Sequence, residues 1–298
     1  MSAKGALAAI ILLLFFYYYA TGAIPQVGTS SGSSSGFVFG VAGLSGTDYP
    51  SSFISSVTGQ YKITAFRMDR DLFTGSAGDQ LPKYVSNGAK VIYLTYGGSQ
   101  TDNPTAWAQG LVSLVQANPQ ITYIGLMNEP NLNGWSPQQY VVFLQAAYKA
   151  LKGAGIHQPL CAFETSGDGD SADQTWIQQA INDGGRGYYD MACIHVYVPQ
   201  TYSTFSSEVS IISSNLDQVH SIVGTTMMIT ETSITGGTGN YVGNNPAGDM
   251  QTLYTMYESK SYMHGAWWYP LLGSTYSLFK SSYSPTALGI EYSSLIAQ

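Results

Sequence analysis

Three of the six glutamates in the chain come at the ends of short apolar segments, in "GLMNEP", "CAFET" and "MITET". They are Glu129, Glu164 and Glu231. Glutamate favours helices, so its recurrence after strand-like segments is informative. Two carboxylates facing each other across a cleft suit the cleavage of a glycosidic bond. One donates a proton to the departing oxygen, while the other, ionised, attacks the anomeric carbon or activates water.

The two acids must differ in protonation state and therefore need different surroundings. Arg67 in "ITAFRMD" could provide the positive charge beside the ionised one. A guanidinium stabilises the ionised form of the nearest carboxylate. The alternative is a structural ion pair of Arg67 with Asp69 or Asp71. His195, in "CIHVY", could be a core histidine or a metal ligand. No second His or Cys lies near it at ligand spacing, so no metal and no cofactor are expected.

The segments that carry these residues belong to a longer alternation of apolar and helix-like stretches. Apolar runs begin near residues 37, 61, 90, 121, 159, 189, 226 and 264, and helix-like segments lie near 51–59, 78–87, 105–117, 137–152, 172–182, 205–222, 247–259 and 285–296. This alternation predicts parallel βαβ units, and eight of them predict an α/β fold, a closed (β/α)8 TIM barrel. An open doubly wound sheet is the alternative, weakened by the lack of a Gly-x-Gly-x-x-Gly or Walker loop after the first run. In a barrel, the active site lies where the strands end, which is where the three glutamates fall.

The chain divides into three segments of different composition. We expect residues 37–298 to form one catalytic (β/α)8 domain, preceded by a Ser/Gly-rich linker at 24–36. Residues 1–23 carry Lys4 and a long apolar run, which could be a signal peptide or an uncleaved membrane anchor. We therefore expect an extracellular protein, either secreted or anchored on the outer face of a membrane.

The amino-acid composition indicates which classes of molecule the protein could bind. The net charge is −7, with 11 Lys plus Arg and no basic cluster, which argues against nucleic-acid binding. Polarity comes from uncharged side chains, including 23 Tyr, and this suits an oligo- or polysaccharide substrate. Cys161 and Cys193 are too few for a disulfide scaffold, so buried free thiols are expected, although an exported protein could oxidise them.

Two motifs resemble a known superfamily. "MNEP" at the end of the fourth apolar run and "ITET" at the end of the seventh are similar to those of the clan A retaining glycoside hydrolases, which include families 5, 39 and 128. The resemblance extends over about residues 37–298. It implies that Glu129 is the acid/base, that Glu231 is the nucleophile and that Asn128 contacts the sugar 2-hydroxyl. It also places Arg67, His195, Tyr197 and Trp267 or Trp268 around the site.

Several assignments stay open. Glu164 is a rival to Glu231, or else a hydrogen-bonded supporting or subsite residue. Trp135 and Trp268 are the aromatic rings best placed to stack on a sugar. "GDGDSAD", residues 167–173, has partial Ca²⁺-loop spacing, but a turn that caps the next helix is favoured.

These features predict a retaining glycoside hydrolase that cleaves a β-linked glycan by double displacement. The alternative is a cell-surface protein that kept the barrel and binds carbohydrate without catalysis. Glu129 and Glu231 together favour the enzyme, because binding alone does not need two acids.

Overall fold

The computed structural model describes residues 36–43, 49–70, 80–199, 201–235 and 241–298. Residues 1–23 and nearly all of the linker at 24–36 lie outside the described residues, so neither the signal peptide nor the anchor is tested. Among the helices that are described, none combines the length and the apolar character needed to cross a membrane.

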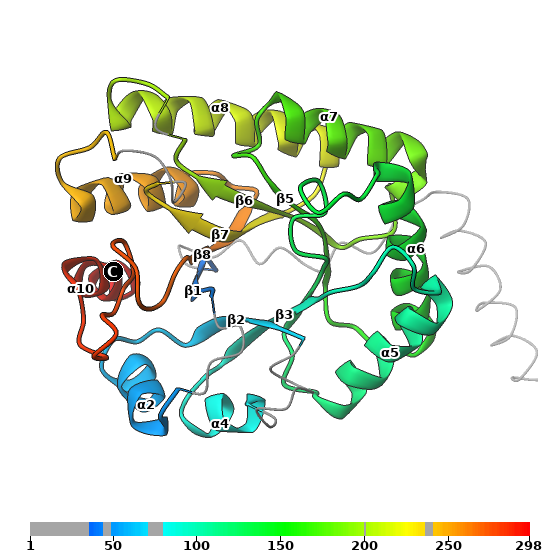
Figure 1. The fold of residues 1–298 in the computed structure, drawn as a ribbon, viewed down its shortest axis with the longest axis horizontal. Helices are drawn as coiled ribbons and strands as arrows, with labels where there is room; N and C mark the ends of the chain where they lie inside the picture. Colours follow the sequence, from blue (N-terminus) through cyan, green and yellow to red (C-terminus); the bar gives the residue numbers. More distant parts are fainter. Residues whose placement is uncertain (1–35, 44–48, 71–79, 200, 236–240) are drawn as a thin grey trace, which may run out of the picture. The chain divides into compact units, whose positions relative to one another are not determined.

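The described residues form a closed barrel of eight parallel strands in sequence order, which confirms the predicted fold. The strands are β1 (Val38–Val41), β2 (Ala65–Asp69), β3 (Val91–Tyr96), β4 (Tyr123–Leu126), β5 (Leu160–Ser166), β6 (Met191–Tyr197), β7 (Met227–Ser233) and β8 (Met263–Trp268). The helices are α2 (Ser51–Gly59), α4 (Leu81–Ser86), α5 (Pro104–Ala117), α6 (Pro137–Gly153), α7 (Ser171–Ala180), α8 (Phe205–Val223), α9 (Pro246–Glu258) and α10 (Ala287–Ile296), with a π-helical segment η1 (Ile181–Gly185) after α7. In Figure 1 these helices surround the strands.

Local sequence signals set several of the helix starts. The Ser136 hydroxyl accepts from the Gln139 N–H at 3.2 Å, and the Gln139 side chain accepts from the Ser136 N–H at 3.1 Å. This capping box satisfies two backbone donors at the start of α6, with Pro137 as the first helical residue. Asp170 caps α7 by accepting from the N–H groups of Ala172 and Asp173, so the "GDGDSAD" segment is the capping turn that the sequence favoured.

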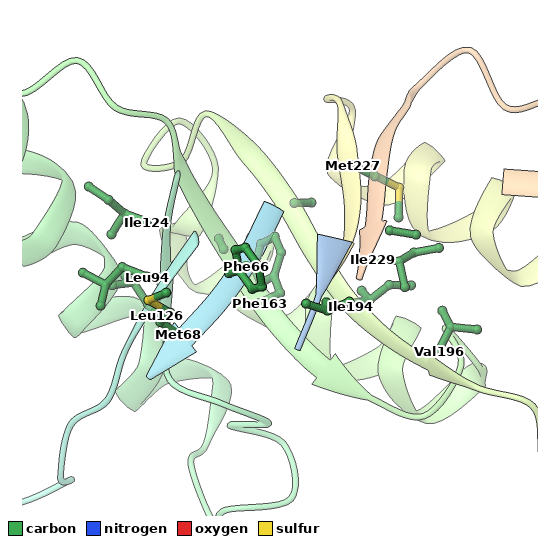
Figure 2. Packing of buried hydrophobic residues seen from close by; sticks show 14 of the residues in the cluster. Phe66, Met68, Leu94, Ile124, Leu126, Phe163, Ile194, Val196, Met227 and Ile229 are labelled. Atoms are coloured by element: carbon green, nitrogen blue, oxygen red, sulfur yellow. The ribbon is translucent and has the colours of Figure 1, made fainter. Parts of the chain in front are cut away.

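Alternation along the strands creates two separate cores. Outward-facing side chains pack against the helices, and Figure 2 shows those of Phe66, Met68, Leu94, Ile124, Leu126, Phe163, Ile194, Val196, Met227 and Ile229. A smaller cluster consists of Ala42, Tyr93, Cys161, Met191, Cys193, Met228 and Trp267. It takes the alternate residues of the same strands and therefore fills the barrel interior. The residues between Phe66 and Met68, and between Ile194 and Val196, are Arg67 and His195, so both face inward.

The structure corrects the expectation of free thiols, because Cys161 and Cys193 form a disulfide. The two residues lie on neighbouring strands, where Cys161 is opposite Met191 and Cys193 is opposite Phe163. Their Cα atoms are 5.7 Å apart, within the range that a disulfide requires. Both side chains belong to the interior cluster, so the strand register brings the two sulfur atoms together.

Candidate active site

A cavity of about 290 Å³ opens where the strands end. It is lined by Gly43, Arg67, Asp69, Asn128, Glu129, Tyr197, Glu231 and Tyr269. Five of the residues singled out in the sequence are therefore together in one cavity, although they come from β2, β6, β7 and the segment after β4. His195 lies directly beneath, fully buried. The C-terminal end of the barrel is thus a candidate active site.

Backbone irregularities turn the acidic side chains toward this cavity. Glu129 and Glu164 have backbone φ angles of 47° and 38°, values that residues other than glycine rarely adopt. The Glu129 N–H donates to the Glu164 carbonyl at 3.1 Å, so the two strained positions support each other. The register of β5 against β6 skips Glu164, and that of β6 against β7 skips Thr230 just before Glu231. Such bulges redirect side chains, and strained backbone of this kind clusters at functional sites.

Arg67 holds three of the polar groups together. Its guanidinium donates to Glu231 in a close ion pair, to Glu164 at 2.8 Å and to the Asn128 side-chain oxygen at 2.6 Å. The charge of Asp69 also acts on Arg67, and Asp71, the other carboxylate considered as a structural partner of Arg67, lies outside the described residues.

Glu164 lies deeper than the other two glutamates. It is fully buried and accepts from the Tyr93 hydroxyl at 2.9 Å as well as from Arg67. A Cβ atom on Gly125 would overlap both Glu164 and Tyr93, so the glycine leaves the space that Glu164 occupies. Burial alone would raise the pKa of Glu164, but Arg67 and His195 bring it below its usual value. With no exposed surface, Glu164 supports Arg67 rather than lining the cavity.

Glu231 is ringed by donors to its ionised form. Besides Arg67 on one oxygen, the Tyr197 hydroxyl donates to the other in a short hydrogen bond. Burial and the charge of Glu231 raise the pKa of Tyr197 well above its usual value, so the phenol stays protonated and can donate. The Glu231 side chain keeps 10% of its surface exposed, which leaves it reachable from the cavity.

His195 connects the acids from below. Its Nδ1 lies 3.1 Å from Glu129 and 3.7 Å from Glu231. Burial disfavours the charged imidazole, but Glu231, Glu129 and Glu164 outweigh it and raise the pKa of His195 to about 9. The hydrogen bond from His195 in turn lowers the pKa of Glu129 below its usual value. The Glu129 side chain is 23% exposed, the most open of the three acids.

The spacing of the two cavity carboxylates is short. One oxygen each of Glu129 and Glu231 and one ring nitrogen of His195 all lie within 4.8 Å of one another. These three residues are therefore the group, among those described, that could hold a metal ion. The charged state favoured for His195 opposes this, since a metal ligand must present a free lone pair.

The tryptophans expected to stack on a sugar are buried and are not among the residues that line the cavity. Trp267 belongs to the barrel interior, and Trp268 packs outward between Tyr254 and Tyr292; neither ring has exposed surface. Trp135 is also buried, against Phe143. None of these three rings presents a face to the cavity.

Tyr269, which follows β8, lines the cavity instead and is 37% exposed. Sequence reasoning missed this residue, although a signal was present. Side chains two residues apart share a face of a strand, so the inward direction of Trp267 returns at Tyr269, and Trp268 must face the helices.

A second cavity, of about 440 Å³, adjoins the first through Asp69 and Asn128. It is lined by Asp69, Arg70, Thr95, Gly97, Gly98, Ser99, Asp102 and Asn128. The guanidinium of Arg70 lies 4.8 Å from the centre of the Tyr96 ring, and Asp102 accepts from the Ser99 N–H at 2.8 Å. The site therefore continues as a polar groove over the ends of β2 and β3.

Comparison with known proteins agrees with this geometry. A family model described as "Glycosyl hydrolase catalytic core" matches residues 79–292. This range includes every sequence-predicted site residue except Arg67. No curated protein sequence matches the chain.

Solved structures similar to this chain share its fold at low sequence identity. A family 39 glycoside hydrolase from the gut symbiont Bacteroides cellulosilyticus WH2 is 17% identical with a TM-score of 0.63; the match covers 87% of this chain and 63% of that one. A family 128 (subgroup II) endo-β-1,3-glucanase from Sorangium cellulosum is 13% identical, with a TM-score of 0.62 and coverages of 86% and 98%. A family 17 β-1,3-glucanosyltransferase from Rhizomucor miehei is 12% identical, with a TM-score of 0.60 and coverages of 84% and 96%. The chain thus spans less than two thirds of the family 39 structure but nearly all of the other two.

Proposed function

The chain belongs to the glycosyl hydrolase catalytic core family, and on that premise we propose that it cleaves a β-linked glycan with retention of anomeric configuration. The observation that carries the proposal is the position of Glu129 and Glu231, whose nearest oxygens lie within 4.8 Å across one cavity. Retaining enzymes hold their two carboxyl groups about 5–5.5 Å apart, whereas inverting enzymes need more than about 6.5 Å to admit a water molecule.

In the proposed reaction Glu231 attacks the anomeric carbon while Glu129 gives its proton to the departing glycosidic oxygen. The bond to the leaving group breaks and an ester to Glu231 forms. Glu129, now ionised, takes a proton from water, whose oxygen bonds to the anomeric carbon and releases Glu231. Arg67 and Tyr197 each donate to one oxygen of Glu231 and hold its carboxyl group in position, and Asn128 faces the cavity beside them.

The adjoining groove supports a polymeric substrate. Its volume exceeds that of the cavity between the acids, and Asp69 and Asn128 belong to both. Its charged groups are Arg70, Asp69 and Asp102, an excess of negative charge that disfavours acidic sugars. Because the family 128 and family 17 structures are named for β-1,3-glucan chemistry, a β-1,3-glucan is the first substrate to test.

A substrate panel tests the function. We expect purified protein to release reducing sugar from at least one of the β-glucans, mannans and xylans, and to hydrolyse an aryl β-glycoside of the same sugar. Proton NMR of the first product should show the β-anomer before mutarotation. First formation of the α-anomer would overturn retention, and binding without turnover at any pH from about 3 to 7 would favour the non-catalytic carbohydrate-binding protein.

The pH dependence of this reaction should respond to His195. Glu129 must be protonated to act as acid, and the hydrogen bond from His195 lowers its pKa, so kcat/KM is expected to decline as pH rises from the acidic range. His195→Gln removes that cation, raises the pKa of Glu129 and should move the high-pH limb upward by about one unit, with a kcat lower by about 10-fold or more.

His220→Gln provides the matched control for this variant. His220 lies on α8, where it stacks on Tyr262 at 4.0 Å, away from the cavity residues. Its pH profile should match that of the wild type. An unchanged high-pH limb in His195→Gln would show that His195 does not set the protonation of Glu129.

We also propose that the protein is exported, through a segment at residues 1–23 that is either cleaved or kept as an anchor. Support comes from its apolar run after Lys4 and from the Cys161–Cys193 disulfide, since disulfides persist in oxidising compartments. N-terminal sequencing of the protein recovered from its native source separates the outcomes: a start after Ala23 indicates cleavage, and a start at Met1 or Ser2 indicates retention.

A further inference from the structure

A short turn after β5, Gly167–Asp173, contacts the segments that carry both proposed catalytic acids. This "GDGDSAD" turn has no part in the proposed chemistry. Gly167, Asp168 and Gly169 have φ angles of 154°, 60° and 68°. A Cβ atom on Gly167 would come within 3.0 Å of the Asp173 carboxylate, so the glycine permits the tight course of the chain around that side chain.

On the side of Glu129, the contact runs through Asn131. The Asn131 amide donates to the Ser166 carbonyl at 2.8 Å and to Asp173 Oδ1 at 3.0 Å, and its oxygen accepts from the Ser166 N–H at 3.1 Å. Asn131 comes two residues after Glu129, and it is the backbone of Glu129 that adopts the left-handed conformation. Two of these hydrogen bonds tie the segment after β4 to the end of β5, and the third ties it to Asp173 at the start of α7.

On the side of Glu231, the contact runs through Tyr197. Pairing of β5 with β6 ends at Ser166 opposite His195, and the Tyr197 N–H beyond it donates to Asp168 Oδ1 at 2.6 Å. The hydroxyl of the same Tyr197 donates to Glu231. Asp168 therefore replaces a strand partner at the point where β6 presents a donor to the proposed nucleophile.

Asp173 connects Asn131, on the side of Glu129, with the backbone next to Asp168, on the side of Glu231. It is fully buried, with one oxygen accepting from Asn131 and the other from the Gly169 N–H at 3.0 Å. Both of its oxygens are thus used as acceptors, a requirement that asparagine cannot meet because one of its two terminal atoms is a donor. Asp168 accepts from the Tyr197 N–H through a single oxygen, Oδ1, and the amide oxygen of an asparagine could accept the same hydrogen bond.

We propose that Asp168 and Asp173 are positioning residues for the hydrolysis, which together with Asn131 hold Glu129 and Tyr197 in their places around Glu231. This inference rests on the proposed function. The charged and titratable groups that face the pair are Asp170 in the same turn, Glu208 on α8, Tyr257 on α9 and His195 on β6. Burial and neighbouring carboxylates raise the pKa of Asp168 to about 7 and that of Asp173 to about 6, so both acids change charge within the working range of a glycosidase.

The test compares Asp168→Ala, Asp168→Asn and Asp173→Asn with Asp170→Ala as the matched control. Asp170 belongs to the same turn, but the hydrogen bonds of its side chain come from backbone N–H groups at the start of α7. We expect Asp168→Ala and Asp173→Asn to lower kcat about 10- to 100-fold with KM changed less than about threefold, because the reacting groups lose alignment. Asp168→Asn should stay within about threefold of the wild type, and Asp170→Ala should melt at a lower temperature with an unchanged kcat.

Two further readouts separate positioning from general destabilisation. The pH profile of kcat in Asp168→Ala should differ from that of the wild type near pH 7, since the variant lacks the carboxyl group whose pKa burial raises to about 7. Amide hydrogen exchange of the peptide containing Tyr197 should be faster in Asp168→Ala than in Asp170→Ala. Equal kcat, pH profile and exchange in those two variants would overturn the proposal. A wild-type protein without turnover on any glycan would overturn the proposed function, and the exchange comparison would still show whether the contacts hold β6 in place.

Discussion

Glu231→Gly is expected to lower hydrolysis of an activated aryl β-glycoside by about 10⁴-fold or more, and added azide is expected to restore turnover with an α-glycosyl azide as product. The physical reason is that the glycine removes the attacking carboxylate and leaves a space beside the anomeric carbon that a small anion can enter. Attack from that side inverts the configuration once, and no second displacement follows.

Glu129→Ala provides the complementary result. Here Glu231 still forms the ester, and azide enters from the side that Glu129 occupied, so the product should be the β-glycosyl azide. Proton NMR of the anomeric coupling distinguishes the two azides. The pair of variants thereby assigns a role to each acid separately.

Glu164→Gly is the variant that decides between the two candidate nucleophiles. Glu164 is fully buried beneath Arg67 and bonded to Tyr93, so its removal should yield no glycosyl azide. An α-glycosyl azide from Glu164→Gly, together with none from Glu231→Gly, would transfer the nucleophilic role to Glu164.

Much of this arrangement could be predicted from the order of apolar runs along the chain. All eight strands and the eight α-helices lie where the alternation placed them, because a strand covered on both faces needs a continuous apolar run. Active sites of such barrels form at the C-terminal ends of the strands, which predicts that the polar residues there lie together. One cavity is indeed lined by Arg67, Asn128, Glu129, Tyr197 and Glu231. Topology alone was enough for these residues, since each lies within three positions of the C-terminal end of a strand.

The burial of individual side chains and the direction in which they point could not be predicted from the order of apolar runs. Glu164 and Glu231 end similar segments, "AFET" and "ITET", yet one is buried and the other reaches the cavity. The difference depends on where the strand register skips a residue, which is a property of the neighbouring strand as much as of the segment itself. The disulfide depends on the same register, since the sulfurs meet only when β5 and β6 are paired.

Arg67→Met is expected to destabilise the folded protein by about 3–5 kcal/mol near pH 7, because it leaves buried carboxylates without their cation. Glu164 determines the sign of the pH dependence. Burial alone would raise its pKa, and Arg67 brings the pKa below the usual value, so the ionised form contributes stability above the ordinary carboxyl pKa that is lost as the pH falls. Without Arg67, the folded protein must instead take up a proton at Glu164, and the penalty of the variant should shrink on acidification.

Urea denaturation near pH 7 and near pH 4.5 measures this difference directly. Arg70→Met is the matched control, since Arg70 is exposed and only three residues away, and it should change stability by less than about 0.5 kcal/mol at either pH. The double variant Arg67→Met, Glu164→Gln should recover part of the loss near pH 7, because the buried charge is gone while the hydroxyl of Tyr93 can still donate to the amide oxygen. An equal loss at both pH values, or no recovery in the double variant, would show that the ion pair of Arg67 with Glu164 does not carry the stability of the site.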